Sequence, residues 1–241
     1  MERVFLRRRI GALFCIVGIL TILSVFAFYF LEPTADVLEM SNAKCVLIID
    51  PGHGGEDGGA VAEDGTQEAD LNLAIALRLR DLTALSGLDA VMTRSDARID
   101  YPPEADTIAA RKTADQRQRV KLIRAVPNGV LISIHQNFYP SEEPHGAQVL
   151  YAETDSSEVF GTRLHTMLVQ SLDQENRRVA APISKDIYLM RNVQCPAVLV
   201  ECGFLSNPQE LRRLQDPGYE TKLSLIMLSS YLQTFQTGWN Q

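Results

Sequence analysis

Residues 45–55 read CVLIIDPGHGG, and this stretch decides how the rest of the chain is interpreted. Its first five residues are continuously apolar, which is the pattern of a strand that is buried on both faces. The apolar run ends at Asp50-Pro51, and His53 then stands among three glycines. Open α/β folds keep their ligand sites where parallel strands end, so His53 is a candidate for chemistry at the edge of a sheet.

Short apolar runs alternate with longer amphipathic runs over residues 44–241. The apolar runs predict strands at 45–49, 90–93, 130–134, 147–151, 187–190 and 197–200. The amphipathic runs predict helices at 68–85, 107–124, 157–174, 208–214 and 219–235. Apolar strands interleaved with helices predict a single-domain α/β sandwich, with a largely parallel central sheet flanked by helices.

The first 31 residues have a different character. Four arginines lie within the first nine residues, and residues 10–31 then form a run of 22 residues without a formal charge. As a helix this run is about 33 Å long, enough to cross a hydrocarbon core of about 30 Å. We expect an uncleaved N-terminal transmembrane helix with the arginines in the cytoplasm, followed by a stalk at 32–43 and an extracytoplasmic domain at 44–241. A cleaved signal peptide is the alternative, although its apolar region is usually shorter.

The charge and cysteine content narrow the classes of partner. Without the four arginines and one glutamate of residues 1–31, the chain carries 19 basic and 29 acidic residues and a formal charge of −10. This balance argues against nucleic acid as a partner. Outside the predicted membrane helix only Cys45, Cys195 and Cys202 remain. We expect buried free thiols, with a Cys195–Cys202 disulfide as the alternative.

A second histidine also follows an apolar run directly. His135 ends the sequence VLISIH, so it and His53 are expected at the carboxyl edge of the same sheet. Two converging imidazoles suit a divalent ion such as Zn²⁺, and Glu68, at the start of the first predicted helix, is the best third ligand. The alternative is a pair of satisfied structural histidines, and spacing alone does not decide between the two.

Glu201 ends the apolar run PAVLVE. An ionised carboxylate beside such a run is costly unless a cation or a hydrogen-bond donor receives it. Near a metal, Glu201 could accept a proton from water as a general base. The alternative is a carboxylate that caps the loop before Pro208.

Together these segments resemble the zinc-dependent N-acetylmuramoyl-L-alanine amidases. The matching blocks are DPGHGG at 50–55, Glu68, SIHQN at 133–137 and PAVLVECGFLSN at 196–207, and they occur in the family's order. Thr93-Arg94 and the segment that begins at Arg119 resemble weaker blocks. Ala69 departs from the lysine that commonly follows the ligand glutamate. The compact chain and residues 185–197 are most similar to the germination-associated spore-cortex branch.

The resemblance implies a Zn²⁺ site formed by His53, Glu68 and His135, with Glu201 as the catalytic carboxylate. The implied reaction is hydrolysis of the amide between N-acetylmuramic acid and the first L-alanine of the peptidoglycan stem peptide. In the germination branch this step precedes formation of muramic δ-lactam in the spore cortex. Some family members need an activating protein partner, so the expected partners are peptidoglycan, the membrane and such an activator.

Three further residues are weaker candidates. Asn137 could hydrogen-bond the substrate, and Arg191 could hold a stem-peptide carboxylate, although a structural ion pair is as good an explanation. Asp50 is a candidate to orient a ligand histidine. His145 and His165 lack the strand-end context and are expected to have surface or packing roles. The rival functions are a catalytically silent or partner-dependent peptidoglycan-binding module, and a zinc hydrolase for another amide.

Overall fold

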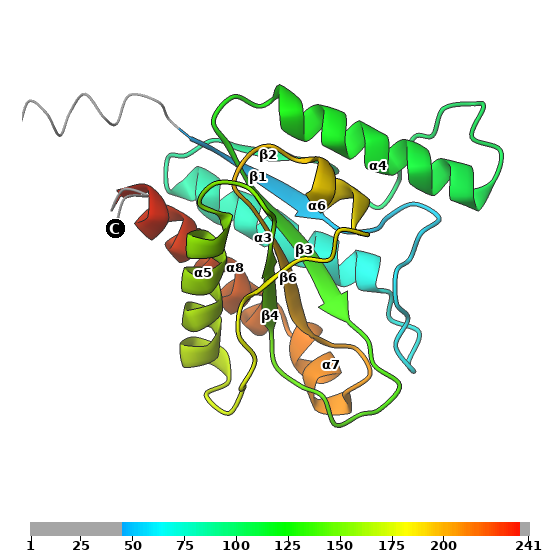
Figure 1. The fold of residues 1–241 in the computed structure, drawn as a ribbon. Helices are drawn as coiled ribbons and strands as arrows, with labels where there is room; N and C mark the ends of the chain where they lie inside the picture. Colours follow the sequence, from blue (N-terminus) through cyan, green and yellow to red (C-terminus); the bar gives the residue numbers. More distant parts are fainter. Residues whose placement is uncertain (1–44, 237–241) are drawn as a thin grey trace, which may run out of the picture. The chain divides into compact units, whose positions relative to one another are not determined.

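The apolar run after Cys45 forms strand β1 (Val46–Pro51), of which five residues are buried. A computed structural model describes residues 45–236, in which β1 belongs to a six-stranded sheet (Figure 1). Across the sheet the strands are β2 (Ala90–Met92), β1, β3 (Gly129–Asn137), β6 (Ala197–Phe204), β4 (Gln148–Tyr151) and β5 (Ala181–Pro182). The central strands β1, β3 and β6 therefore lie side by side.

The direction of the strands divides the sheet into two parts. β2, β1, β3 and β6 are parallel, and β4 pairs antiparallel with β6 and parallel with β5. Only a short loop joins β3 to β4, and a parallel return needs a crossover of a dozen or more residues. β4 therefore runs back in the opposite direction, and the sheet that we predicted as largely parallel is mixed.

Helices cover both faces of the sheet, because successive strand residues point to opposite sides. One face packs against α3 (Glu68–Leu85), α5 (Ser157–Leu172) and α8 (Pro217–Gln236). The other packs against α4 (Ile108–Ala125) and α6 (Tyr188–Asn192). α7 (Pro208–Leu214) follows the end of β6. The five predicted helices are all present, with ends within two residues of those expected.

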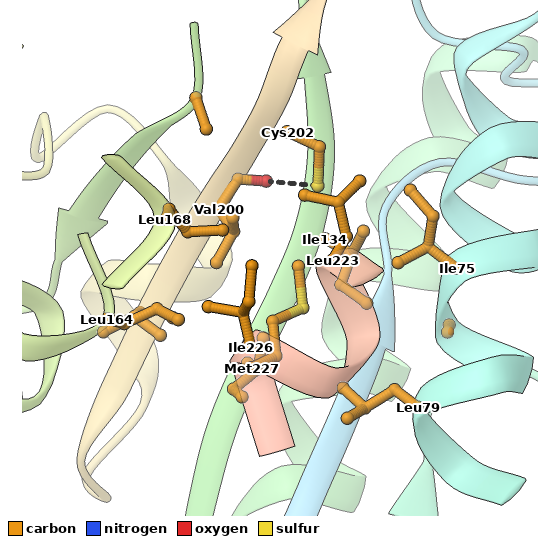
Figure 2. Close-up of a cluster of buried hydrophobic side chains, with 14 of the residues drawn as sticks. Ile75, Leu79, Ile134, Leu164, Leu168, Val200, Cys202, Leu223, Ile226 and Met227 are labelled. Carbon is orange, nitrogen blue, oxygen red and sulfur yellow. Dashed lines mark hydrogen bonds between the residues drawn. The ribbon is translucent and has the colours of Figure 1, made fainter. Parts of the chain in front are cut away.

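The larger core lies between the sheet and α3, α5 and α8. Figure 2 shows Ile75 of α3 and Leu164 of α5 directed toward the same cluster as Val200 of β6 and Met227 of α8. Cys202 lies in this cluster, where its thiol donates to the carbonyl of Val200 over 3.8 Å. Each large aliphatic side chain buried in this way stabilises the fold by about 1.5–3 kcal/mol.

The strand predicted at 187–190 was wrong, because this segment begins helix α6. Leu189 and Met190 are neighbours in sequence and both are buried, whereas Ile187 and Tyr188 are exposed. Arg191 N donates to the carbonyl of Ile187 over 3.0 Å, which is the hydrogen bond of a helical turn. Strand β5 was not predicted, because two residues are too few to show an apolar run or an alternation.

Two further expectations from the sequence have different outcomes. Cys45, Cys195 and Cys202 are free thiols, so the Cys195–Cys202 disulfide is not formed. Within residues 45–236, no helix is both long and apolar enough to cross a bilayer. The membrane helix expected in residues 1–31 and the stalk expected at 32–43 lie outside the described residues.

Candidate metal site at the carboxyl edge of the sheet

The structure brings His53, Glu68 and His135 together where β1 and β3 end. One possible ligand atom from each lies within 4.8 Å of the other two. Glu68 Oε2 is 3.3 Å from His53 Nε2, and Glu68 Oε1 is 2.9 Å from His135 Nδ1. The two imidazole rings meet edge to face, with centroids 5.1 Å apart. All three predicted ligands therefore converge on one point.

His53 adopts an uncommon backbone conformation, with φ at 59°. Left-handed geometry costs a non-glycine residue about 1 kcal/mol or more, so it persists only where neighbours hold it. Arg119 Nη2 donates to the carbonyl of His53 over 2.7 Å, and Arg94 Nη2 donates to that of Gly52 over 3.0 Å. Two buried guanidinium groups thus fix the loop that presents His53.

Gly52 allows the loop to approach the second histidine. A Cβ at position 52 would lie 2.2 Å from His135 Cε1, a distance at which one of the two must move. Glycine is therefore required here by the packing of backbone against imidazole. This contact accounts for the glycine directly before His53.

Asp50 has a different role from the one we predicted. Its buried carboxylate accepts hydrogen bonds from Thr93 Oγ1 and Ser133 Oγ, both at 2.6 Å, and from Arg119 Nη1 at 2.8 Å. Burial opposes its ionisation, but Arg119 and the two hydroxyls hold the pKa of Asp50 below its usual range. Because these donors occupy its oxygens, Asp50 ties β1 to its neighbours and does not orient a histidine ring.

The carboxylate that contacts a ligand histidine is Asp57. Its Oδ2 lies 2.9 Å from His53 Nδ1 and 3.0 Å from Lys112 Nζ on α4. This contact leaves His53 Nε2 directed toward Glu68. Burial works against protonation of His53, but Glu68 and Asp57 raise its pKa above the ordinary value. The sequence analysis did not identify Asp57 as a site residue. The one feature of the sequence that could have pointed to it is its position in the same glycine-rich loop as His53.

Glu68 is the first residue of α3 and is buried. Its Oε2 accepts from Ala60 N at 3.0 Å, and its Oε1 accepts from Gln136 N at 3.1 Å and from Asn72 Nδ2 at 3.3 Å. Burial raises its pKa, but the two histidines outweigh that effect and place the pKa well below the usual range. Glu68 is therefore ionised and held in place by its neighbours.

Glu201 is the register partner of His135 on the adjacent strand β6. Paired residues of neighbouring strands point to the same face, so the two side chains share the face that α4 and α6 cover. Glu201 Oε2 is buried and has no hydrogen-bond partner within residues 45–236. Burial is the main cause that raises the pKa of Glu201 to about 7.

The alternative role of Glu201 as a loop cap is filled by another residue. Asn207 Oδ1 accepts from Gln209 N at 2.9 Å and from Glu210 N at 3.1 Å, which caps α7. Glu201 is therefore not needed to start that helix. Its carboxylate faces the histidine pair from the neighbouring strand.

The two candidate substrate-binding residues, Asn137 and Arg191, do not join the three converging ligands. Asn137 lies at the end of β3, where its Oδ1 accepts from Phe138 N at 2.8 Å. Arg191 was expected just after a strand, but it lies within helix α6. Its side chain is exposed, and its guanidinium lies 5.9 Å from the centre of the Tyr188 ring. His145 is exposed and pairs with Asp173, and His165 is buried with its Nε2 2.7 Å from the Arg178 carbonyl oxygen. Both of these histidines have the surface and packing roles that were predicted.

The donor set fits zinc. Two imidazole nitrogens and one carboxylate oxygen are the protein ligands of many catalytic zinc sites, which keep a further position for water or substrate. A second carboxylate with a raised pKa stands on the adjacent strand. At the end of parallel strands, this arrangement is typical of metal-dependent hydrolases.

Residues 47–228 match the N-acetylmuramoyl-L-alanine amidase family. The chain belongs to this family and is an N-acetylmuramoyl-L-alanine amidase. The germination-specific N-acetylmuramoyl-L-alanine amidase of Bacillus subtilis is 34% identical over 233 residues, which cover 95% of this chain and 97% of the relative. The predicted likeness to the germination branch is confirmed by this relative.

Solved structures agree with the family. The CwlD amidase of Clostridioides difficile, in complex with the GerS lipoprotein, is 33% identical with a TM-score of 0.76, and the match covers 80% of this chain and 98% of that one. The catalytic domain of CwlV from Bacillus (Paenibacillus) polymyxa is 26% identical with a TM-score of 0.68, over 80% and 99%. Both structures are amidases with the same fold.

Proposed function

We propose that the enzyme uses Zn²⁺ to hydrolyse the amide between N-acetylmuramic acid and L-alanine in peptidoglycan, with Glu201 as its catalytic carboxylate. The observation that carries this proposal is the convergence of His53, Glu68 and His135 beside Glu201. A structural role for the histidines would not explain a buried carboxylate oxygen without a partner on the adjacent strand.

The proposed ligands have distinct tasks. His53 and His135 would each give an imidazole nitrogen, and Glu68 a carboxylate oxygen. Zinc, when bound, would polarise the scissile carbonyl and lower the pKa of water. Asp57 would fix the ring of His53, and the hydrogen bonds from Asn72 and from the backbone of residues 60 and 136 would fix Glu68.

Glu201 would move the proton. It accepts one from the attacking water as the water oxygen bonds to the lactyl carbonyl carbon. It then delivers that proton to the amide nitrogen while the carbon–nitrogen bond breaks, which frees the lactyl carboxyl group and the amine of L-alanine. A carboxyl with a pKa of about 7 is suited to both steps near neutral pH.

The biological setting is proposed from the relatives and from residues 1–31. The germination-specific relative supports a role in the spore cortex, where peptide removal would lead to muramic δ-lactam. The lipoprotein complex of the C. difficile relative supports an activating protein partner. The arginines before a long uncharged run support a single membrane helix, with the catalytic domain outside the cytoplasm.

The test uses the full-length protein in mild detergent, depleted of metal and then reconstituted with zinc. We expect about one zinc per chain and, after digestion of intact peptidoglycan, new lactyl carboxyl and L-alanine amine ends by mass spectrometry. Cleavage at another amide would contradict the substrate assignment. Peptidoglycan binding without cleavage would support the catalytically silent or partner-dependent module. A reporter fused after residue 43 tests the proposed orientation, which a cytoplasmic signal would overturn.

A further inference from the structure

A groove of about 510 Å³ lies at the same edge of the sheet as the candidate metal site. Its walls come from residues 61–64 of the glycine-rich loop, 138–142 after β3 and 205–211 after β6. Phe138 is three residues beyond His135, and three extended residues span about 10 Å. Leu205 is four residues beyond Glu201. The groove therefore continues from the strands that carry the site.

The groove presents apolar side chains to solvent. Val61, Phe138 and Tyr139 are 51%, 49% and 56% exposed, and all three line it. Its walls are tied to each other, since Ser206 Oγ accepts from Tyr139 N at 3.1 Å and the Asn137 carbonyl accepts from Leu205 N at 2.8 Å. Clustered exposed apolar residues in a preformed concavity are typical of a ligand-binding surface.

The charge of the groove limits what it can bind. Its charged lining residues are the exposed acids Glu63, Asp64 and Glu142, and no lysine, arginine or histidine lines it within the described part of the chain. The substrate has two chemically different parts. A stem peptide carries free carboxylates, which the acidic rim repels. The glycan of N-acetylated sugars is uncharged, and the apolar faces of its rings can stack on aromatic side chains.

We propose that Phe138 and Tyr139 form a glycan subsite, which holds the N-acetylhexosamine backbone of peptidoglycan beside the metal site. This inference rests on the proposed amidase function, and it names which part of the substrate lies on this side. The stem peptide then leaves the site in another direction. The rival occupant is a basic segment of a protein partner, which the same acidic rim would attract.

The kinetic test compares two substrates of the full-length enzyme. One is a glycan strand of several disaccharides with stem peptides, and the other is N-acetylmuramoyl-tripeptide, which has a single sugar. We expect Phe138→Ala and Tyr139→Ala each to lower kcat/KM on the strand by about tenfold, mainly through KM. Both variants should cleave the single-sugar substrate like the parent. Leu85→Ala, which removes an 84% exposed side chain at the far end of α3, is the matched control and should change neither rate.

A binding test separates this inference from the amidase reaction. The tetramer of N-acetylglucosamine, which has no scissile amide, is titrated into the full-length protein and followed by calorimetry. We expect the parent and Leu85→Ala to bind it, and Phe138→Ala and Tyr139→Ala to bind it about tenfold more weakly. Sugar binding without cleavage of either substrate would favour the catalytically silent or partner-dependent module and would leave the subsite standing.

Three results would overturn the subsite. The first is equal loss of activity on both substrates, which would show that the aromatic residues act through the metal site. The second is unchanged kinetics on the glycan strand together with unchanged sugar binding. This outcome would leave the groove to a protein partner. The third is failure of the parent protein to bind the sugar tetramer.

Discussion

Glu68 and Glu201 are two glutamates of one site, but their surroundings are opposite. Glu68 begins α3 and accepts three hydrogen bonds besides its contacts with both histidines. Glu201 ends an apolar strand, and its Oε2 has no partner within residues 45–236. The pKa of Glu68 lies well below its usual range, whereas burial raises that of Glu201 to about 7.

This difference shows how one fold assigns different tasks to the same side chain. An ionised, fixed carboxylate is suited to hold a cation, because its charge and position are set before the cation binds. A carboxylate without partners, with a pKa near neutral, is suited to gain and lose a proton. We therefore expect a substitution of Glu201 to lower the reaction rate, and a substitution of Glu68 to lower the affinity for zinc.

The largest expected effect is on the rate after Glu201→Gln. We expect kcat to fall by about 1,000-fold, because the side chain can no longer accept a proton from water. Zinc content should stay at the parent level, because Glu201 is not among the three converging ligands. Peptidoglycan digestion and metal analysis measure the two quantities. The matched control is Glu153→Gln, at an exposed position, and should keep full activity. Activity retained in Glu201→Gln would remove Glu201 from the mechanism.

Glu68→Gln should impair zinc binding and not the proton transfer. We expect zinc affinity to fall by at least about 100-fold, since the variant loses the charge that faces both imidazoles. The amide NH2 also replaces one of the two carboxylate oxygens, so it faces either Ala60 N or Gln136 N, each of which is a donor itself. Competition with a chromophoric chelator measures the affinity. Parent-like affinity would mean that Glu68 is not a ligand.

A smaller effect is expected from the residue that positions His53. Asp57→Ala removes the partner of His53 Nδ1, so zinc affinity should fall by about 10- to 100-fold. Asp100→Ala, at an exposed aspartate that pairs with Arg98, is the control and should keep the parent affinity. An identical affinity in both variants would show that Asp57 does not orient the ring.

The smallest effect is expected at Lys112, whose Nζ lies 3.0 Å from Asp57 Oδ2. Lys112→Met should lower zinc affinity by about threefold or less, because a partly exposed ion pair contributes little. The difference should disappear at about 1 M salt, where exposed charges are screened. A difference that persists in high salt would mean that Lys112 acts by packing over the loop.

Much of the fold could be predicted because its pattern is strong. Continuous apolar runs gave β1, β3 and β6, and long amphipathic runs gave the five predicted helices. The antiparallel direction of β4 was not predicted, although the loop between β3 and β4 is too short for a parallel crossover. α6 was missed because a five-residue helix has too few turns to show a period.

The site was predictable as far as its residues stand at strand or helix ends. His53, His135 and Glu201 follow apolar runs, and Glu68 begins a helix. Arg94 donates to the carbonyls of residues 51, 52 and 69, and no local pattern records these contacts. Asp57 reaches His53, four residues before it, because the glycine-rich loop turns back between them. Arg191 was misplaced, because its proposed role assumed a strand that is a helix.

The most direct test of the comparison is a titration of the Glu201 carboxyl in the metal-free protein. Carbon-13 NMR follows it, with Glu201→Gln used to assign the signal. We predict a midpoint at about pH 7, and a stability relative to Glu201→Gln that falls as the pH rises from about 4.5 to about 7. The sign follows because the folded state favours the neutral carboxyl. A midpoint near 4.5, with constant relative stability, would contradict the account.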